Sequence, residues 1–180
     1  MQIFLQIFFA NILLLIMLIT IHEIGHWLMG VAAGIPARMM KIRLLTFPQQ
    51  VVLRDGDEWV SVSDFDRYYR LLEQHAPSRE RQFLYVVGGF LFETTFLFLL
   101  CFFLAKNGYT LYAIVAPGVS LLMYLIYLFA MDLPQSRSLK RPWGDTTILY
   151  SLAPRAAVAV AVLMVLLRVI LILAVPIGIF

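Results

Sequence analysis

The chain has 180 residues, of which 62% are hydrophobic, and its formal net charge is +3 at pH 7. Its apolar runs exceed the roughly 18 residues that mark a membrane-spanning candidate, which excludes an ordinary soluble domain. A single cysteine, Cys101, excludes an intrachain disulfide. We therefore expect the lipid bilayer as a partner, and no nucleic acid.

The first hydrophobic segment, residues 3–34, carries the sequence H-E-I-G-H near its end. Residues four apart lie on one face of a helix, so His22 and His26 can direct their imidazoles at one metal ion. Glu23 stands beside the first of these ligands, within reach of a water molecule, and can act as a general base. The alternative is a chance grouping of polar residues. A charged group at bilayer depth costs roughly 3 kcal/mol, which favours a function.

The same helical face carries Asn11, three turns before His22. We expect this face to contact other helices and take Asn11 as a candidate supporting residue.

Residues 35–82 form the only sizeable polar region. Residues 51–54 and 59–62 flank the pair Asp55-Gly56, a pattern that predicts a β-hairpin around a tight turn. Residues 41–47 offer a further strand. An exposed edge of this hairpin could receive an extended peptide by β-addition, or the hairpin merely connects two spans.

An amphipathic helix is predicted next, because large side chains recur at i, i+3, i+4 and i+7: Phe65, Tyr68, Tyr69 and Leu72. Ser63 followed by Asp66 resembles a capping box at its start, and Pro77 ends it. We expect this helix on the membrane surface or against the hairpin.

Three further spans are predicted at residues 83–105, 111–131 and 146–178, the last interrupted at Pro154-Arg155. Glu93 lies nearly halfway along the second span. It could pair with a buried cation or donor, relay protons or bind metal, and structural pairing is the interpretation we favour. Arg155 could meet Glu93 or extend to the interface.

Two histidines still need a third protein ligand to hold zinc with one position open. Besides Glu23, the acidic residues at or within the spans are Glu93, Asp132 and Asp145. Position favours Asp145, because its loop returns to the membrane face where the H-E-I-G-H helix ends. Its alternative role is that of a helix N-cap.

Basic residues are concentrated in two loops: Arg38, Lys41, Arg43, Arg54, Arg67, Arg70, Arg79, Arg81, Arg137, Lys140 and Arg141. The opposite side has Lys106 alone. By the positive-inside rule both basic loops are cytosolic, which places both chain ends outside and the metal site near the cytosolic face. The predicted fold is thus an all-α polytopic membrane protein of four helices, with a small cytosolic insertion of a β-hairpin and an amphipathic helix.

These motifs together resemble the site-2 protease family of intramembrane zinc metalloproteases. Beside H-E-I-G-H, Gly88-Gly89 stands where the family tends to have Gly-Pro, and Asp132-Leu133-Pro134 where it has Asn-x-x-Pro. Asp145 falls at the aspartate of the family's Leu-Asp-Gly motif.

The resemblance implies a minimal protease core, one domain spanning residues 1–180, that hydrolyses peptide bonds of membrane-spanning or membrane-associated substrates. It implies one zinc ion per chain, held by His22, His26 and Asp145, with Glu23 activating water. Asp132 and the glycine pair become candidates for substrate binding or support.

The competing function is a non-proteolytic membrane module, either a zinc-binding scaffold or a protein that holds a client helix. An intact Glu23 argues against a catalytically dead relative of this kind, because a purely structural metal site needs no base beside its ligand.

Overall fold

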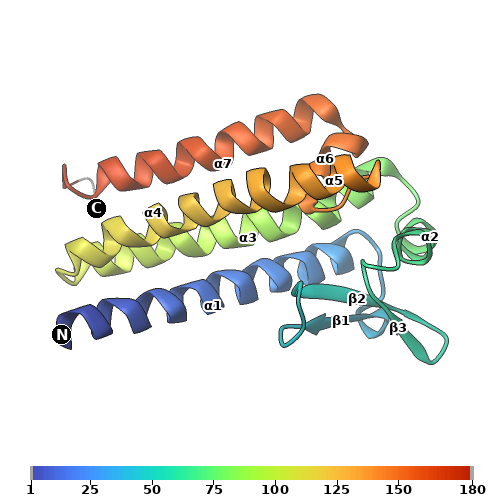
Figure 1. Cartoon of the computed structure of the whole chain (residues 1–180), viewed down its shortest axis with the longest axis horizontal. Helices are drawn as coiled ribbons and strands as arrows, with labels where there is room; N and C mark the ends of the chain where they lie inside the picture. Colours follow the sequence, from blue (N-terminus) through green and yellow to red (C-terminus); the bar gives the residue numbers. More distant parts are fainter. Residues whose placement is uncertain (1, 179–180) are drawn as a thin grey trace.

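The computed structural model describes the backbone of residues 2–178 and the side chains of residues 5–178. Within these residues the chain is mostly helical, with one small antiparallel sheet. Figure 1 shows four long helices side by side, with the sheet and the short helices at one end and both chain ends at the other.

The long helices are α1 (Gln2–Ala32), α3 (Arg79–Lys106), α4 (Thr110–Ile126) and α7 (Pro154–Ala174). All are long and apolar enough to cross a membrane, α4 when taken with the residues up to Leu139. Their outer faces expose large apolar side chains such as Phe9, Phe103 and Leu173. Such a surface suits lipid better than water, and the expectation of four apolar helices is confirmed.

Two of the predicted spans are built from more than one helical segment. After α4 the chain continues through a π-helical turn (Tyr127–Asp132) into α5 (Leu133–Leu139). The expected last stretch is two helices, α6 (Asp145–Leu152) and α7, separated at Ala153. The break follows from Pro154, which has no N–H to give to a continuous helix but fits well at the first position of a new one.

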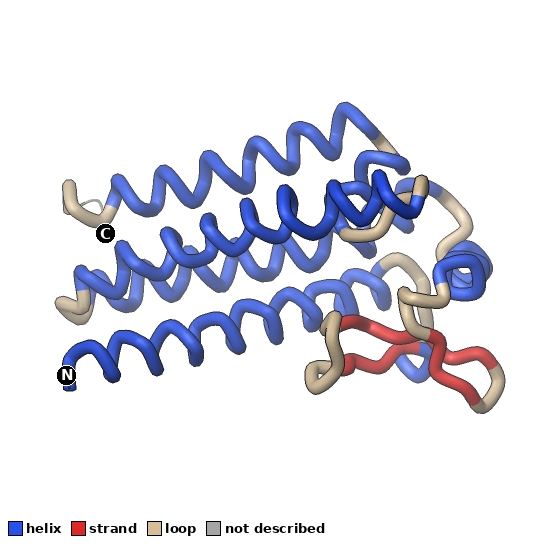
Figure 2. The backbone as a smooth tube through the Cα atoms, in the orientation of Figure 1, coloured by secondary structure: helices blue, strands red, loops and turns tan. Residues whose placement is uncertain are grey.

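The strands are β1 (Met40–Arg43), β2 (Gln50–Asp55) and β3 (Glu58–Val60), after a short 3-10 turn at Ala37–Met39. They form one antiparallel sheet in the order β1-β2-β3, drawn red in Figure 2. Pairing of Asp55 with Glu58 leaves Gly56-Asp57 as the two-residue turn, one position later than predicted. Gly56 takes a φ of +60°, which favours glycine. The hairpin and the further strand are both confirmed.

Helix α2 (Phe65–His75) confirms the predicted amphipathic helix and packs on β2. Tyr68, Leu71 and Leu72 form its buried face. The predicted capping box is wrong: the N-cap is Asp64, and its side chain makes no capping hydrogen bond. Ser63 lies in the preceding turn, where its N–H donates to the Ser61 hydroxyl over 3.1 Å.

Helices α1 and α3 pack most closely where Gly25 faces Gly88. A Cβ atom added at Gly88 would lie 2.6 Å from the Gly25 carbonyl oxygen and 2.6 Å from Met29 Cβ. Only glycine permits this approach, which presses the histidine-bearing face of α1 against α3.

Candidate metal site

The two histidines of α1 point their Nε2 atoms at each other across 3.0 Å. The Nδ1 atom of His26 contacts the backbone carbonyl oxygen of Tyr85 at 3.1 Å, and that of His22 contacts Glu93 Oε2 at 3.2 Å. Both partners are acceptors, so in a neutral ring Nδ1 carries the hydrogen and Nε2 carries a lone pair. The lone pairs of both rings therefore converge on one point.

Asp145 completes this convergence from α6. Its Oδ2 atom lies 2.9 Å from His22 Nε2 and 3.3 Å from His26 Nε2. The N-cap of α6 is Gly144, so the alternative role of Asp145 as an N-cap is wrong.

Asp132 holds the start of α6 in place. It is fully buried, and its carboxylate accepts hydrogen bonds from the N–H of Gly144 at 3.0 Å and from the N–H of Thr147 at 3.1 Å. The Thr147 hydroxyl also donates to it. Asp132 thus satisfies N–H groups that the first turn of a helix leaves free, and it fixes the direction in which Asp145 points.

The geometry of the three donor atoms fits a divalent metal such as zinc. Two ligands at 2.0–2.1 Å from a tetrahedral ion lie roughly 3.3 Å apart, close to the separations of 2.9, 3.0 and 3.3 Å found here. A Cβ atom added at Gly89 would lie 2.6 Å from both Nε2 atoms, so the absence of a side chain keeps this space open. A carboxylate and a backbone carbonyl on the Nδ1 atoms are the usual partners of metal-binding histidines.

Glu23 lies beside this donor set and is buried. One ligand atom from each of His22, Glu23 and His26 lies within 4.8 Å of the other two. The Oε2 atom of Glu23 has no hydrogen-bond partner among the described residues. A buried oxygen without a partner in the protein is available to a water molecule or a metal.

Comparisons with protein-family models, curated proteins and solved structures gave no match. What the site can do therefore follows from its own donor atoms and their geometry.

Glu93 lies next to the site but faces the Nδ1 atom of His22, on the far side of the ring from the donor set. Its ion-pair partner is Arg168, at 2.7 Å, so Arg155 as partner is wrong. Glu93 and Arg168 each lie fourteen residues after the first residue of their helices, Arg79 and Pro154. Both helices start at the sheet end, so both charges lie about 20 Å along the bundle.

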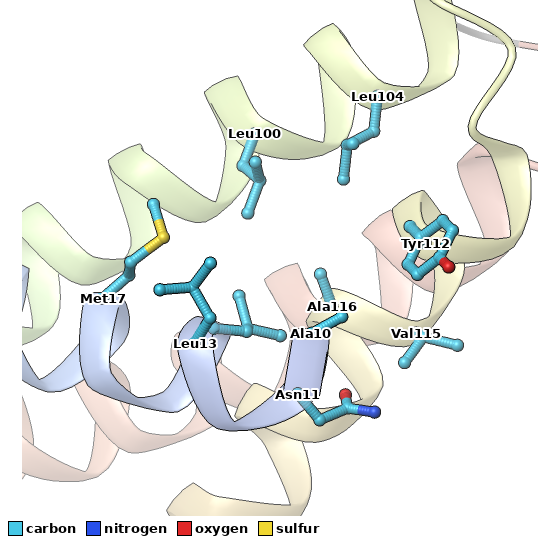
Figure 3. Close-up of a pocket in the computed structure, with 10 residues that line it drawn as sticks. Ala10, Asn11, Leu13, Met17, Leu100, Leu104, Tyr112, Val115 and Ala116 are labelled. Atoms are coloured by element: carbon cyan, nitrogen blue, oxygen red, sulfur yellow. The ribbon is translucent and has the colours of Figure 1, made fainter. Parts of the chain in front are cut away.

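Asn11 is the one predicted residue that lies away from the others. It lines a groove of about 230 Å³ beside Leu100 of α3 and Tyr112 of α4 (Figure 3). Its amide donates to the Ile7 carbonyl oxygen of its own helix over 2.9 Å. Eleven residues separate it from His22, about 16 Å along α1.

Sequence reasoning missed the parts of the site that carry no motif. The Tyr85 carbonyl and the hydroxyls of Thr147 and Ser120 gave no signal, because any helix offers such groups. Arg168 gave a signal as an opposite charge within a span, but the predicted spans start at residues 83 and 146 and do not place it level with Glu93; the break before Pro154 does.

Proposed function

We propose that the chain is a membrane-embedded zinc endopeptidase that hydrolyses peptide bonds of membrane-associated proteins or peptides. One observation carries the proposal: His22 Nε2 and His26 Nε2 of the apolar helix α1 and Asp145 Oδ2 of α6 converge within 3.3 Å. Beside them lies a Glu23 oxygen that has no hydrogen-bond partner among the described residues. Three protein ligands and one open position are the arrangement of catalytic zinc sites. The resemblance to site-2 proteases points the same way.

The proposed placement has all four long helices crossing the bilayer, with the sheet end in the cytosol. The two basic loops belong to the sheet end, and Lys106 to the end where the chain termini lie. By the positive-inside rule this orientation is favoured. His22 is ten residues before the end of α1 at Ala32, which puts the site about 15 Å inside the cytosolic boundary.

The zinc ion, held by His22, His26 and Asp145, would supply Lewis acidity and make a water molecule easier to deprotonate. The Glu23 carboxylate accepts a proton from that water while the water oxygen attacks the peptide carbonyl carbon. When the C–N bond breaks, Glu23 returns the proton to the departing nitrogen, which leaves as an amine. The Oε2 atom of Glu23 has no hydrogen-bond partner among the described residues and is the oxygen available to exchange the proton.

The substrate must be unwound before attack, because hydrogen bonds shield the peptide groups of a helix. We propose that an outer strand of the sheet holds the unwound segment by β-addition, giving main-chain hydrogen bonds to an extended peptide. In β2, the inner strand, the carbonyl oxygen of Val51 is occupied by the Tyr68 hydroxyl at 3.0 Å. This leaves the outer edges of β1 and β3 for a peptide.

The test replaces Glu23 and measures metal and cleavage separately. Glu23→Gln should keep about one zinc ion per purified chain, since the three ligands remain, but abolish cleavage. Membrane peptides from cells that express each variant are compared by mass spectrometry. The matched control is Glu73→Gln, an exposed residue on α2. Turnover by Glu23→Gln above a tenth of wild type would exclude Glu23 as the base.

The same experiment separates the protease from a zinc-binding scaffold. We compare cells that express the zinc-loaded wild type with a chelator-treated sample. If neither contains cleavage products, the protein is not an endopeptidase.

A further inference from the structure

Two opposite charges are buried together in the middle of the helix bundle. The side chain of Arg168 on α7 is 0% exposed, and its Nη2 atom donates to Glu93 Oε1 on α3 over 2.7 Å. A charged pair at this depth is costly, and a buried ion pair stabilises a fold little compared with apolar side chains of the same size. Stability alone is therefore a weak reason for its presence.

Ser120 of α4 joins the pair. Its hydroxyl donates to Glu93 Oε1 at 2.9 Å and accepts from Arg168 Nε at 2.9 Å. Arg168 also donates from Nη1 to the Met164 carbonyl oxygen of its own helix at 3.0 Å, which fixes the direction of the guanidinium. One oxygen of Glu93 is thus held from two helices.

The other oxygen of Glu93 faces His22. With Oε1 held by Arg168 and Ser120, Oε2 is directed at His22 Nδ1, 3.2 Å away on α1. This carboxylate of α3 therefore contacts side chains of α4, α7 and α1. Its partner on α1, His22, is one of the proposed metal ligands.

Aromatic rings give a second connection between the same residues. The guanidinium of Arg168 lies 5.8 Å from the ring centroid of Tyr124, whose ring meets Phe90 edge-on at 5.8 Å. Phe90 in turn meets the ring of His22 edge-on at 5.3 Å. The imidazole of His22 is thus confined by Glu93 and by the ring of Phe90, which connects it through Tyr124 to Arg168.

We propose that Arg168 and Ser120 are positioning residues that act through Glu93 to orient the imidazole of His22 for metal binding. This inference rests on the proposed metal site. The physical reason is general: a carboxylate on the free nitrogen of a histidine fixes the ring and strengthens its bond to the metal. Helix α7 then belongs to the support of the metal site, although it contributes no ligand.

The test measures metal binding by the full-length protein in detergent, stripped with a chelator and titrated with Co²⁺ while its visible spectrum is recorded. Glu93→Gln should weaken Co²⁺ binding by about 10- to 100-fold and shift the absorption bands. Arg168→Gln should also weaken Co²⁺ binding, and Ser120→Ala should weaken it less. Arg168→Lys should bind Co²⁺ more tightly than Arg168→Gln, because it keeps the positive charge. The control is Thr95→Val, because within the described part of the chain Thr95 donates to Leu91 of its own helix alone.

The double variant Glu93→Gln with Arg168→Gln should bind Co²⁺ no more weakly than Glu93→Gln alone, because Arg168 acts through Glu93. A purely structural pair would instead lower the melting temperature of the metal-free protein and leave affinity and spectrum unchanged, which would overturn the inference. Should the Glu93 variant fail to fold, unchanged affinity in both Ser120→Ala and Arg168→Lys overturns it equally. Wild-type protein that binds no Co²⁺ would overturn the proposed metal site as well.

Discussion

Gly89 offers the most direct test of the position proposed for the metal. In Gly89→Ala the new Cβ atom would lie 2.6 Å from Nε2 of both His22 and His26, whereas ordinary contacts begin at 3.4 Å. Each nitrogen would have to retreat by about 0.8 Å. That is more than a third of a zinc–nitrogen bond of about 2.0–2.1 Å.

We therefore expect Gly89→Ala to weaken zinc binding by at least about 100-fold, beyond the usual effect of changing a partner of a ligand. Zinc per chain, measured by mass spectrometry on purified protein, and competition with a chelator give the magnitude. Helix propensity would by itself favour alanine by up to about 1 kcal/mol, so poor folding of α3 is not the expected cause.

Two other glycines are matched controls. In Gly88→Ala the added atom would strike the Gly25 backbone and Met29, so the α1–α3 contact should loosen and the melting temperature should fall, whether or not metal is present. At Gly118 an added Cβ meets nothing within 4 Å, so Gly118→Ala should resemble wild type in both measurements. Full zinc loading at wild-type affinity in Gly89→Ala would refute a metal held between the two Nε2 atoms.

Two further predictions concern ligands and orientation. Asp145→Asn and Asp145→Ser should both lose zinc and cleavage, although both residues suit helix starts, and near-normal zinc in Asp145→Ser would end its assignment as a ligand. Asp132→Asn should keep zinc with reduced cleavage, because an amide oxygen still accepts some of the hydrogen bonds to α6. In protein lacking Cys101, cysteines at Asp57 and Ser138 should be labelled from the cytosol and one at Asn107 only from outside; cytosolic labelling at Asn107 would reverse the orientation.

Features that depend on neighbours along the chain were predicted well. Hydropathy alone located the four apolar helices, since a span must keep about 20 consecutive residues compatible with lipid. Helical periodicity alone placed His22 and His26 side by side, as their Nε2 separation of 3.0 Å confirms. The hairpin and α2 followed equally from local patterns of period two and period 3.6.

The failed predictions concern hydrogen bonds, which local patterns do not determine. Ser63 and Asp66 have the spacing of a capping box, but the turn before α2 uses the Ser61 hydroxyl instead. The predicted contact of Arg155 with Glu93 fails because Arg155 lies at the start of α7, about 20 Å from the level of Arg168. Small shifts in where a helix begins decide such pairings.

The sequence by itself thus determined the apolar helices, the two histidines and the carboxylate beside them, because each depends on residues within a few positions of one another. Only the tertiary structure decided that Asp145, more than a hundred residues later, turns its side chain to those histidines rather than capping α6. It also decided that Glu93 meets Arg168 and His22 at once. These contacts join different helices, so they depend on how the bundle packs at Gly25 and Gly88 and on the anchoring of α6 by Asp132, which no local pattern encodes.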